Sequence, residues 1–391
     1  MLYAVKILSG QAFKDRIERE SFRRGIESLF QLNKLNSPVA PRFLFHTNTP
    51  LGVAMELIQG ATLADLHDGS KSVVQDYWHS AILKICRSLL MCHTSEGEVL
   101  HRDIKPKNVI FEGVYVGCDG QDFLDAKVRF INFDMSWHKF SAGNTKSVSA
   151  DEIGYYAPEQ INLSNSDSPR TAKTDVYMLG MTLFSLLADI PPPEGGARVK
   201  DWASLVDGKV RLKLKEDKLA ASRVSRLVKR MTDPDPDRRP DLQSVISNLE
   251  VIGYAMQNDW GKSDPDLLVE KLLTEFGYDY EWSEADIRGT LLTPRQIELS
   301  LGYLPRGQRV EIRWMRQRDE GADRRNFGGK LGELADKVKL QLSEGGWQVE
   351  EGGGHHSRSV SANIQVRSIV ANWDSSRAKL QDIVMKLMGN V

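Results

Sequence analysis

The first part of the chain carries short apolar runs that predict a small sheet and one helix. Residues 2–7 are rich in β-branched and aromatic side chains, which predicts a strand, and residues 13–35 place apolar side chains at helical spacing. Two further apolar runs, 42–46 and 52–57, flank the turn-rich residues 47–50. This arrangement indicates a hairpin.

From residue 59 to about residue 257 the apolar pattern is mainly helical. The most apolar stretch, Val176 to Ile190, is shorter than the ~20 residues that cross a bilayer, so it predicts a buried helix. Long loops are expected over 101–111, 117–127, 134–172 and 190–200. This part of the chain is expected to form a helical lobe with functional loops.

Beyond residue 258 the pattern predicts a separate β-α-β-β-α unit. Ser263-Asp264-Pro265 and Thr293-Pro294 have the form of helix starts. Strands are expected around 310–314, 347–349 and 364–366, and helices around 331–342 and 380–387. The glycine-rich residues 351–356 are expected to form a loose loop between the last two strands.

Composition and charge narrow the classes of function. The chain has 391 residues, and its 52 Lys and Arg residues almost balance its 53 Asp and Glu residues, which gives a net charge of -1. This balance argues against nucleic-acid binding through overall charge. The densest basic region, Arg313 to Arg325, is diluted by acidic residues, so a solvated loop or a protein-docking surface is favoured there.

The three cysteines favour a reducing compartment. Cys86, Cys92 and Cys118 form no CxxC pair and cannot all pair within one chain. The N-terminal residues lack the pattern of an export signal. A cytoplasmic protein without membrane association is therefore expected.

The stretch from Leu100 to Ile110 carries the clearest chemistry. It places on one short loop a carboxylate that can orient and deprotonate a hydroxyl (Asp103), a cation for a phosphate (Lys105) and an oxygen ligand for Mg²⁺ (Asn108). The loop, LHRDIKPKNVI, resembles the H-R-D-x-K-x-x-N catalytic loop of eukaryotic-type (Hanks) protein kinases without a gap. Lys105 followed by Pro106 is the form typical of serine/threonine kinases.

Further matches follow in the family's order over about 250 residues. Ala4-Val5-Lys6 resembles the strand whose lysine binds the α- and β-phosphates. Met55-Glu56-Leu57-Ile58 resembles the hinge that receives adenine, so Met55, Glu56 and Ile58 are candidate nucleotide-binding residues. Residues 154–159 and 174–180 resemble the end of the activation segment and the central helix. The resemblance implies that Glu159 pairs with Arg239 and that Asp175 braces the catalytic loop.

The resemblance implies an α+β, two-lobed protein-kinase-like fold. Residues 1–58 would form a partial N-lobe of sheet and helix, residues 59–257 a helical C-lobe, and residues 258–391 a small α+β domain that regulates or binds a protein partner. The implied activity is transfer of the ATP γ-phosphate to protein Ser or Thr hydroxyls, with Mg²⁺ or Mn²⁺. Arg102 implies control by phosphate on the activation segment, where an ordinary polar loop is the alternative; the candidate hydroxyls are Ser141, Thr145, Ser147 and Ser149.

The metal-binding motif departs from the family. The position of D-F-G reads Asn132-Phe133-Asp134, so the main Mg²⁺ carboxylate is replaced by an amide, which brings no charge to the metal. Asn132 remains a candidate for nucleotide and metal binding together with Asn108. Asp134 is a candidate substitute ligand, if a shifted backbone brings it to the metal.

The N-lobe departs from the family twice. Gly25 stands where the helix is expected to supply a glutamate to Lys6, and Glu18 is the candidate substitute. No glycine-rich loop precedes Lys6, so two strands of the family are not found in this sequence; either its start is truncated or another segment replaces the loop. Without these strands, one sheet edge with part of an apolar face is expected to be uncovered. These departures favour the alternative of a pseudokinase, a nucleotide-binding or scaffolding module.

Two remaining polar clusters are weak candidates for metal binding. Asp119, Asp122 and Asp125 lack the glycine and closing glutamate of a calcium loop, so a solvated hairpin is expected there. His355-His356 has no nearby ligand partner and is expected to lie in a flexible loop.

Overall fold

The computed structural model divides the chain into two compact units, one of residues 1–216 and 220–253 and the other of residues 217–219 and 254–391. The structure describes residues 3–257 except 35–36, 69–72, 142–149, 162–170 and 216; beyond them it describes 280–283, 286–292, 297–304, 309–317, 336, 339–340, 343, 348–354 and 357–365.

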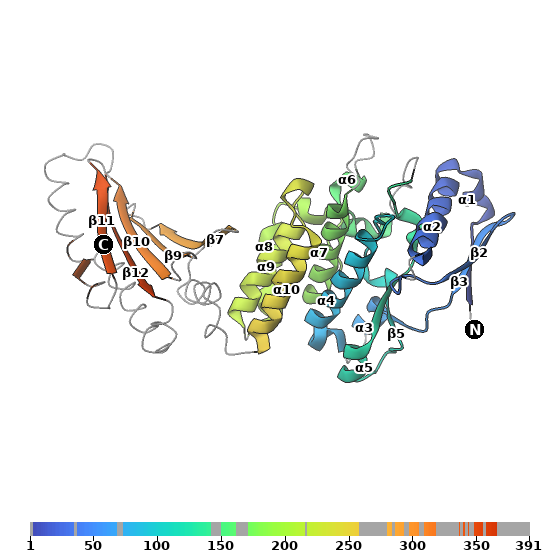
Figure 1. Cartoon of the computed structure of the whole chain (residues 1–391), viewed down its shortest axis with the longest axis horizontal. Helices are drawn as coiled ribbons and strands as arrows, with labels where there is room; N and C mark the ends of the chain where they lie inside the picture. Colours follow the sequence, from blue (N-terminus) through green and yellow to red (C-terminus); the bar gives the residue numbers. More distant parts are fainter. Residues whose placement is uncertain are drawn as a thin grey trace. The chain divides into compact units, whose positions relative to one another are not determined.

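A three-stranded antiparallel sheet begins the first unit, with strand order β1-β3-β2 (Figure 1). Its strands are β1 (Tyr3–Ile7), β2 (Phe43–Asn48) and β3 (Leu51–Glu56). The predicted strand and hairpin are therefore confirmed. The β1 side chains Tyr3, Val5 and Ile7 are each more than half exposed, at 62%, 58% and 56%, which agrees with the expected uncovered apolar face.

The expected helix over 13–35 is two helices, α1 (Gly10–Lys14) and α2 (Arg16–Lys34). The break lies at Asp15, whose backbone is extended (φ -82°, ψ 125°) and whose carboxylate accepts a hydrogen bond from the N–H of Ile17 at 2.7 Å. Asp15 therefore ends one helix and caps the next.

Helices make up most of the remainder of the first unit. They are α3 (Leu63–His67), α4 (Val73–His93), α5 (Gly120–Asp125), α6 (Pro158–Ile161), α7 (Ala172–Ala188), α8 (Trp202–Lys213), α9 (Lys218–Met231) and α10 (Leu242–Gln257). The 3₁₀ turns are η1 (Pro106–Asn108), η2 (Phe133–Met135), η3 (Ala150–Tyr155), η4 (Gly196–Arg198) and η5 (Pro236–Arg238). A second sheet consists of β4 (Gly60–Thr62), β5 (Val109–Glu112) and β6 (Lys127–Phe130).

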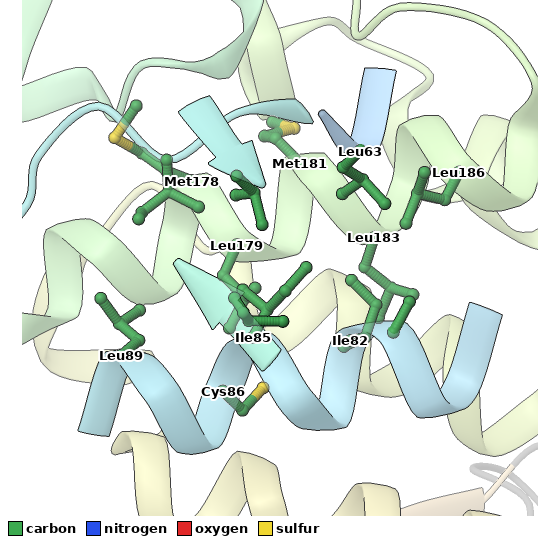
Figure 2. Close-up of a cluster of buried hydrophobic side chains, with 14 of the residues drawn as sticks. Leu63, Ile82, Ile85, Cys86, Leu89, Met178, Leu179, Met181, Leu183 and Leu186 are labelled. Carbon is green, nitrogen blue, oxygen red and sulfur yellow. The ribbon is translucent and has the colours of Figure 1, made fainter. Parts of the chain in front are cut away.

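The core of the helical lobe lies between α4 and α7 (Figure 2). Ile82, Ile85 and Leu89 point from α4 toward α7 at helical spacing, and Cys86 of the same helix is also buried. Helix α7 is buried from Thr174 to Ala188 and ends where Asp189 turns left-handed (φ 55°). The predicted buried helix is therefore confirmed. Among the described residues, no helix has the length and apolarity needed to span a membrane.

The loop expected over 117–127 contains regular structure. Asp119 caps α5, because its carboxylate accepts a hydrogen bond from the N–H of Asp122 at 2.9 Å. The hairpin expected around these aspartates is therefore wrong, since local capping stabilises a short helix. The loop expected over 101–111 likewise ends in strand β5, because Val109 to Glu112 pair with β6.

The second unit contains a six-stranded antiparallel sheet in the order β11-β12-β10-β9-β8-β7. Its strands are β7 (Tyr280–Ser283), β8 (Asp286–Leu292), β9 (Ile297–Leu304), β10 (Arg309–Gln317), β11 (Gln348–Gly354) and β12 (Ser357–Gln365). A helix starting at Thr293 is wrong, because β8 and β9 pair directly across those residues. The loop expected over residues 351–356 is wrong for Glu351 to Gly354, because these residues belong to β11 and pair with β12. Several predictions lie outside the described residues: the helix starting at 263, the helix at 380–387, most of the helix at 331–342, and the His355-His356 pair.

Candidate active site

An aspartate on α7 holds the catalytic loop in place. Asp175 is fully buried, and its carboxylate accepts hydrogen bonds from the backbone N–H groups of His101 (2.9 Å) and Arg102 (2.6 Å). It also lies 2.8 Å from Nε2 of His93. Burial would raise the pKa of Asp175, but these contacts outweigh burial and lower it. The predicted bracing of the loop by this residue is confirmed.

The loop brings Asp103, Lys105 and Asn108 together. Nδ2 of Asn108 donates to Oδ2 of Asp103 at 2.6 Å and to its backbone oxygen at 2.8 Å. Nζ of Lys105 lies 3.0 Å from Oδ1 of Asp103. The local cause is turn η1, which begins at Pro106 and returns the chain so that Asn108 faces Asp103. All three residues are buried.

Two side chains from the end of the activation segment also contact this group, and the sequence analysis missed both. The hydroxyl of Tyr156 donates to Oδ1 of Asp103 at 2.8 Å. The carboxylate of Glu152 lies 2.6 Å from Nζ of Lys105 and 2.9 Å from Nζ of Lys107. The only local signal was an acidic residue in a segment otherwise rich in hydroxyls. Nothing in the sequence pattern distinguished Tyr156 from Tyr155.

The charges of this group stabilise one another. Burial would lower the pKa of Lys105, but the Asp103 and Glu152 carboxylates outweigh burial and raise it. Burial would raise the pKa of Glu152, yet hydrogen bonds from Lys105 and Lys107 hold it below its ordinary value. Both side chains are therefore charged at neutral pH. They also border a cavity of about 210 Å³ between the ends of α3 and α7, so solvent reaches this side of the loop.

Asn132 connects the two lobes. Its backbone is left-handed (φ 65°, ψ 66°), and its Oδ1 accepts a hydrogen bond from Nζ of Lys6 at 2.8 Å. Its Nδ2 donates to Oδ2 of Asp103 at 3.1 Å. The amide thus joins an ammonium group to a carboxylate, which an aspartate at this position could not do without a bound cation.

Asp134 supplies the carboxylate that contacts Lys6. Its Oδ2 lies 2.7 Å from Nζ of Lys6, so the structure pairs this lysine with Asp134 instead of Glu18. The turn that carries Asp134 lies against α2: Ser21 donates from its hydroxyl to the Asp134 backbone oxygen. A Cβ added at Gly25 would lie 2.9 Å from the backbone oxygen of Phe133. Glycine at position 25 therefore permits the close approach that brings Asp134 to Lys6.

The hinge residues lie at the end of β3. Met55 is partly buried against the core, and Ile58 is 8% exposed. The Glu56 carboxylate accepts a hydrogen bond from Nη2 of Arg129 at 2.7 Å, and the backbone N–H of Glu56 donates to the backbone oxygen of Arg42 at 2.9 Å. Arg129 also donates to the backbone oxygen of Ala40 at 3.0 Å.

Other predicted contacts are found at the end of the activation segment. Arg239 is fully buried and makes a bidentate pair with Glu159, with N–O distances of 2.7 and 2.9 Å. The predicted pairing of these residues is confirmed. The hydroxyl of Ser141 accepts a hydrogen bond from the N–H of His138 at 3.0 Å. Thr145, Ser147 and Ser149 lie outside the described residues.

Comparison with known proteins identifies the family. The sequence profile of the protein kinase domain matches residues 1–249. The chain belongs to the protein kinase family. It is similar to calcium-dependent protein kinase 22 of Oryza sativa subsp. japonica (26% identity over 241 residues, 60% of this chain and 38% of that protein). It is also similar to serine/threonine-protein kinase Nek2 of Homo sapiens (27% over 217 residues, 53% and 44%) and to serine/threonine-protein kinase PknB of Mycobacterium tuberculosis (27% over 203 residues, 50% and 30%).

The match spans the sheet-containing N-terminal part and the helical part of the first unit, as the predicted fold class requires. The chain spans less than half the length of these relatives, with shares of 38%, 44% and 30%.

Proposed function

We propose that this kinase domain transfers the γ-phosphate of ATP to Ser or Thr hydroxyls of protein substrates. The observation that carries the proposal is the buried group of Asp103, Lys105 and Asn108, in which both carboxylate oxygens of Asp103 are fixed by hydrogen bonds. Phosphoryl transfer needs positioned charges more than covalent chemistry, and this group supplies them.

Each residue of the site has a role in the proposal. Asp103 orients the substrate hydroxyl and accepts its proton, and Lys105 stabilises charge on the transferred phosphoryl group. Lys6 binds the α- and β-phosphates, and the hinge backbone at Met55, Glu56 and Ile58 binds adenine. The relatives named as serine/threonine kinases support this class of substrate.

Asn108, Asn132 and Asp134 are the proposed ligands of Mg²⁺ or Mn²⁺. The donor set fits a hard cation, because it consists of one carboxylate and two amide carbonyls. Oδ1 of Asn132 and Oδ2 of Asp134 lie 2.8 and 2.7 Å from the same nitrogen of Lys6, so both face one point. The described residues hold no group of three His, Cys, Asp or Glu suited to a metal, so amide oxygens would complete the site. A bound ion would neutralise charge on the β- and γ-phosphates.

A second candidate function is that of a pseudokinase, which one observation favours. The side chains of the site contact one another in a closed arrangement, because Lys6 contacts Asn132 and Asp134 while Asn132 contacts Asp103. A scaffold could use this closed arrangement as its working state. The retained Asp103, Lys105 and Asn108 favour the enzyme, since a scaffold has no chemical need for them.

The roles of the remaining chain are part of the proposal. The domain over residues 258–391 is proposed to regulate the kinase domain or to bind a protein partner. A cytoplasmic location is proposed from Cys86, Cys92 and Cys118, all of which are free thiols.

Transfer of labelled γ-phosphate from ATP to the chain and to a generic Ser/Thr protein substrate tests the proposal. The wild type is expected to transfer phosphate with Mg²⁺ or Mn²⁺. Asp103→Asn keeps the side-chain shape but removes the base, so transfer is expected to fall by about a hundredfold or more. Asp76→Asn, on α4, is the control and should leave transfer unchanged. No transfer by the folded wild type with either metal would favour the pseudokinase.

A further inference from the structure

The hydroxyl of Tyr156, at the end of the activation segment, contacts Asp103, the proposed catalytic base. Tyr156 is 3% exposed, so its ring is fixed by packing, and its hydroxyl lies 2.8 Å from Oδ1 of Asp103. The following residues anchor this part of the segment: Nε2 of Gln160 donates to the backbone oxygen of Arg102 at 2.9 Å, and Glu159 pairs with Arg239. These contacts tie the segment that carries Tyr156 to the loop that carries Asp103, so the hydroxyl is held against the carboxylate.

Asp103 accepts four hydrogen bonds, two on each carboxylate oxygen. Oδ1 receives Tyr156 and Lys105, and Oδ2 receives Asn108 at 2.6 Å and Asn132 at 3.1 Å. A carboxylate offers about four acceptor positions, so all of them are filled. A substrate hydroxyl can donate to Asp103 only after one of these four donors leaves.

The donors differ in how readily they leave. The Asn132 contact is the longest, and its side chain is tied to Lys6, a residue that the proposed function assigns to the phosphates. Lys105 is shared, because its nitrogen lies closer to Glu152 (2.6 Å) than to Asp103 (3.0 Å). Tyr156 belongs to a buried, anchored segment. Tyr156 is therefore the donor that stays on Oδ1 when Asn132 leaves Oδ2.

We infer that Tyr156 is a positioning residue for phosphoryl transfer: its hydroxyl fixes Oδ1 of Asp103, so that Oδ2 faces the substrate hydroxyl. Glu152 assists by holding Lys105 partly away from Asp103, which keeps the ammonium group from neutralising the base. The inference rests on the proposed function. It adds that the end of the activation segment aligns the base through an uncharged hydroxyl.

The pair Tyr156→Phe and Tyr155→Phe in the full chain tests the inference. Each variant removes one hydroxyl from adjacent, largely buried rings, but it is the Tyr156 hydroxyl that donates to Asp103. Tyr156→Phe is expected to lower kcat about tenfold or more, because a hydrogen bond to a charged group is lost. The KM for ATP should stay within about twofold, and Tyr155→Phe should keep a kcat within about twofold of the wild type. Glu152→Gln is expected to lower kcat in the same direction.

Thermal unfolding and ATP titration of each variant separate positioning from loss of fold. Tyr156→Phe should unfold and bind ATP as Tyr155→Phe does. Unchanged kcat in Tyr156→Phe, or an equal fall in both tyrosine variants, would overturn the inference while leaving the proposed function intact. A wild type that transfers no phosphate would overturn the proposed function, and the inference with it.

Discussion

An amide can serve two partners of opposite charge at once, and Asn132 uses this property between Lys6 and Asp103. Its carbonyl accepts from the ammonium group at 2.8 Å, and its NH₂ group donates to the carboxylate at 3.1 Å. A carboxylate at position 132 would lose the donor and oppose Asp103 with a like charge. The departure from D-F-G thus allows residue 132 to hydrogen-bond to both Lys6 and Asp103.

Asn132→Asp is expected to make the stability of the chain depend on metal. Two carboxylates about 3 Å apart repel, so without a metal the free energy of unfolding should fall by about 1–3 kcal/mol. Mg²⁺ should restore most of this loss by binding between them. Thermal unfolding in EDTA and in Mg²⁺ measures the effect.

The control for this variant is Asn248→Asp on α10, where the Asn248 amide donates to the backbone oxygen of Ser244 at 2.8 Å. That substitution should change stability equally with and without Mg²⁺. A metal response of the same size in both variants would contradict the assignment of position 132 to a metal site.

At the residue scale, sequence-based prediction was most successful for contacts between residues that are close together in the sequence. Asp103, Lys105 and Asn108 lie within one turn-forming stretch, so their offsets fixed their proximity. The partner of Lys6 was not predictable in the same way. It depends on the left-handed backbone of Asn132 and on a contact across 126 residues.

At the scale of elements, α2 and turn η2 form the contact that shapes the side of the site where Lys6 lies. Gly25 is buried, and an added Cβ would lie 2.9 Å from the oxygen of Phe133 and 3.2 Å from Cα of Asp134. Helix α2 therefore has glycine where a glutamate partner for Lys6 was expected, and turn η2 supplies Asp134 as that partner.

Gly25→Ala is expected to weaken ATP binding and to destabilise the chain. Alanine would favour the helix by about 1 kcal/mol, but the backbone contact with Phe133 should cost about 1–3 kcal/mol and push Asp134 from Lys6. Calorimetric titration with ATP and denaturant unfolding measure the two effects.

Gly208→Ala provides the matched control, because Gly208 lies in α8 with no atom within 4 Å of an added Cβ. This variant should gain about 0.5–1 kcal/mol of stability and bind ATP as the wild type does. If Gly25→Ala behaves in the same way, the close contact of α2 with η2 does not position Asp134.

Element prediction failed most clearly in the second unit. Ile297, Leu299, Leu301 and Tyr303 alternate with small or polar residues, which is a strand signal, but Thr293-Pro294 has the form of a helix start. A proline after threonine fits the turn between two strands as well as the first turn of a helix. Pairing of Ile297–Leu304 with β8 and β10 shows that a strand follows these residues.

At the scale of the whole molecule, buried ion pairs make the stability of the kinase unit depend on pH. Burial would raise the pKa of Glu159, but Arg239 outweighs burial and lowers it below the ordinary value of 4.5. A lowered pKa in the folded state adds stability above the ordinary pKa, and this stability is lost as the pH falls through the folded pKa. The midpoint of thermal unfolding should therefore fall as the pH decreases below about 4.5.

Glu159→Gln should lose about 3–5 kcal/mol at pH 7, because Arg239 is left buried without its charge partner, and should show a weaker pH dependence in acid. Glu250→Gln, which removes an exposed pair with Arg87, should change stability by less than about 1 kcal/mol. Unfolding curves at pH 7 and pH 4 distinguish the two. Equal losses of unfolding free energy in both variants would show that the buried pair stabilises the chain no more than the exposed pair does.

The order of motifs along the chain was enough to predict the kinase fold, the catalytic loop, its support by Asp175 and the Glu159–Arg239 pair. These features follow from contiguous residues or from positions that the fold always brings together. Tertiary structure alone decided the partner of Lys6, the bridge made by Asn132 and the contacts of Tyr156 and Glu152 with the loop. Such contacts depend on backbone conformation and on how closely two segments approach, and neither leaves a periodic signal in the sequence.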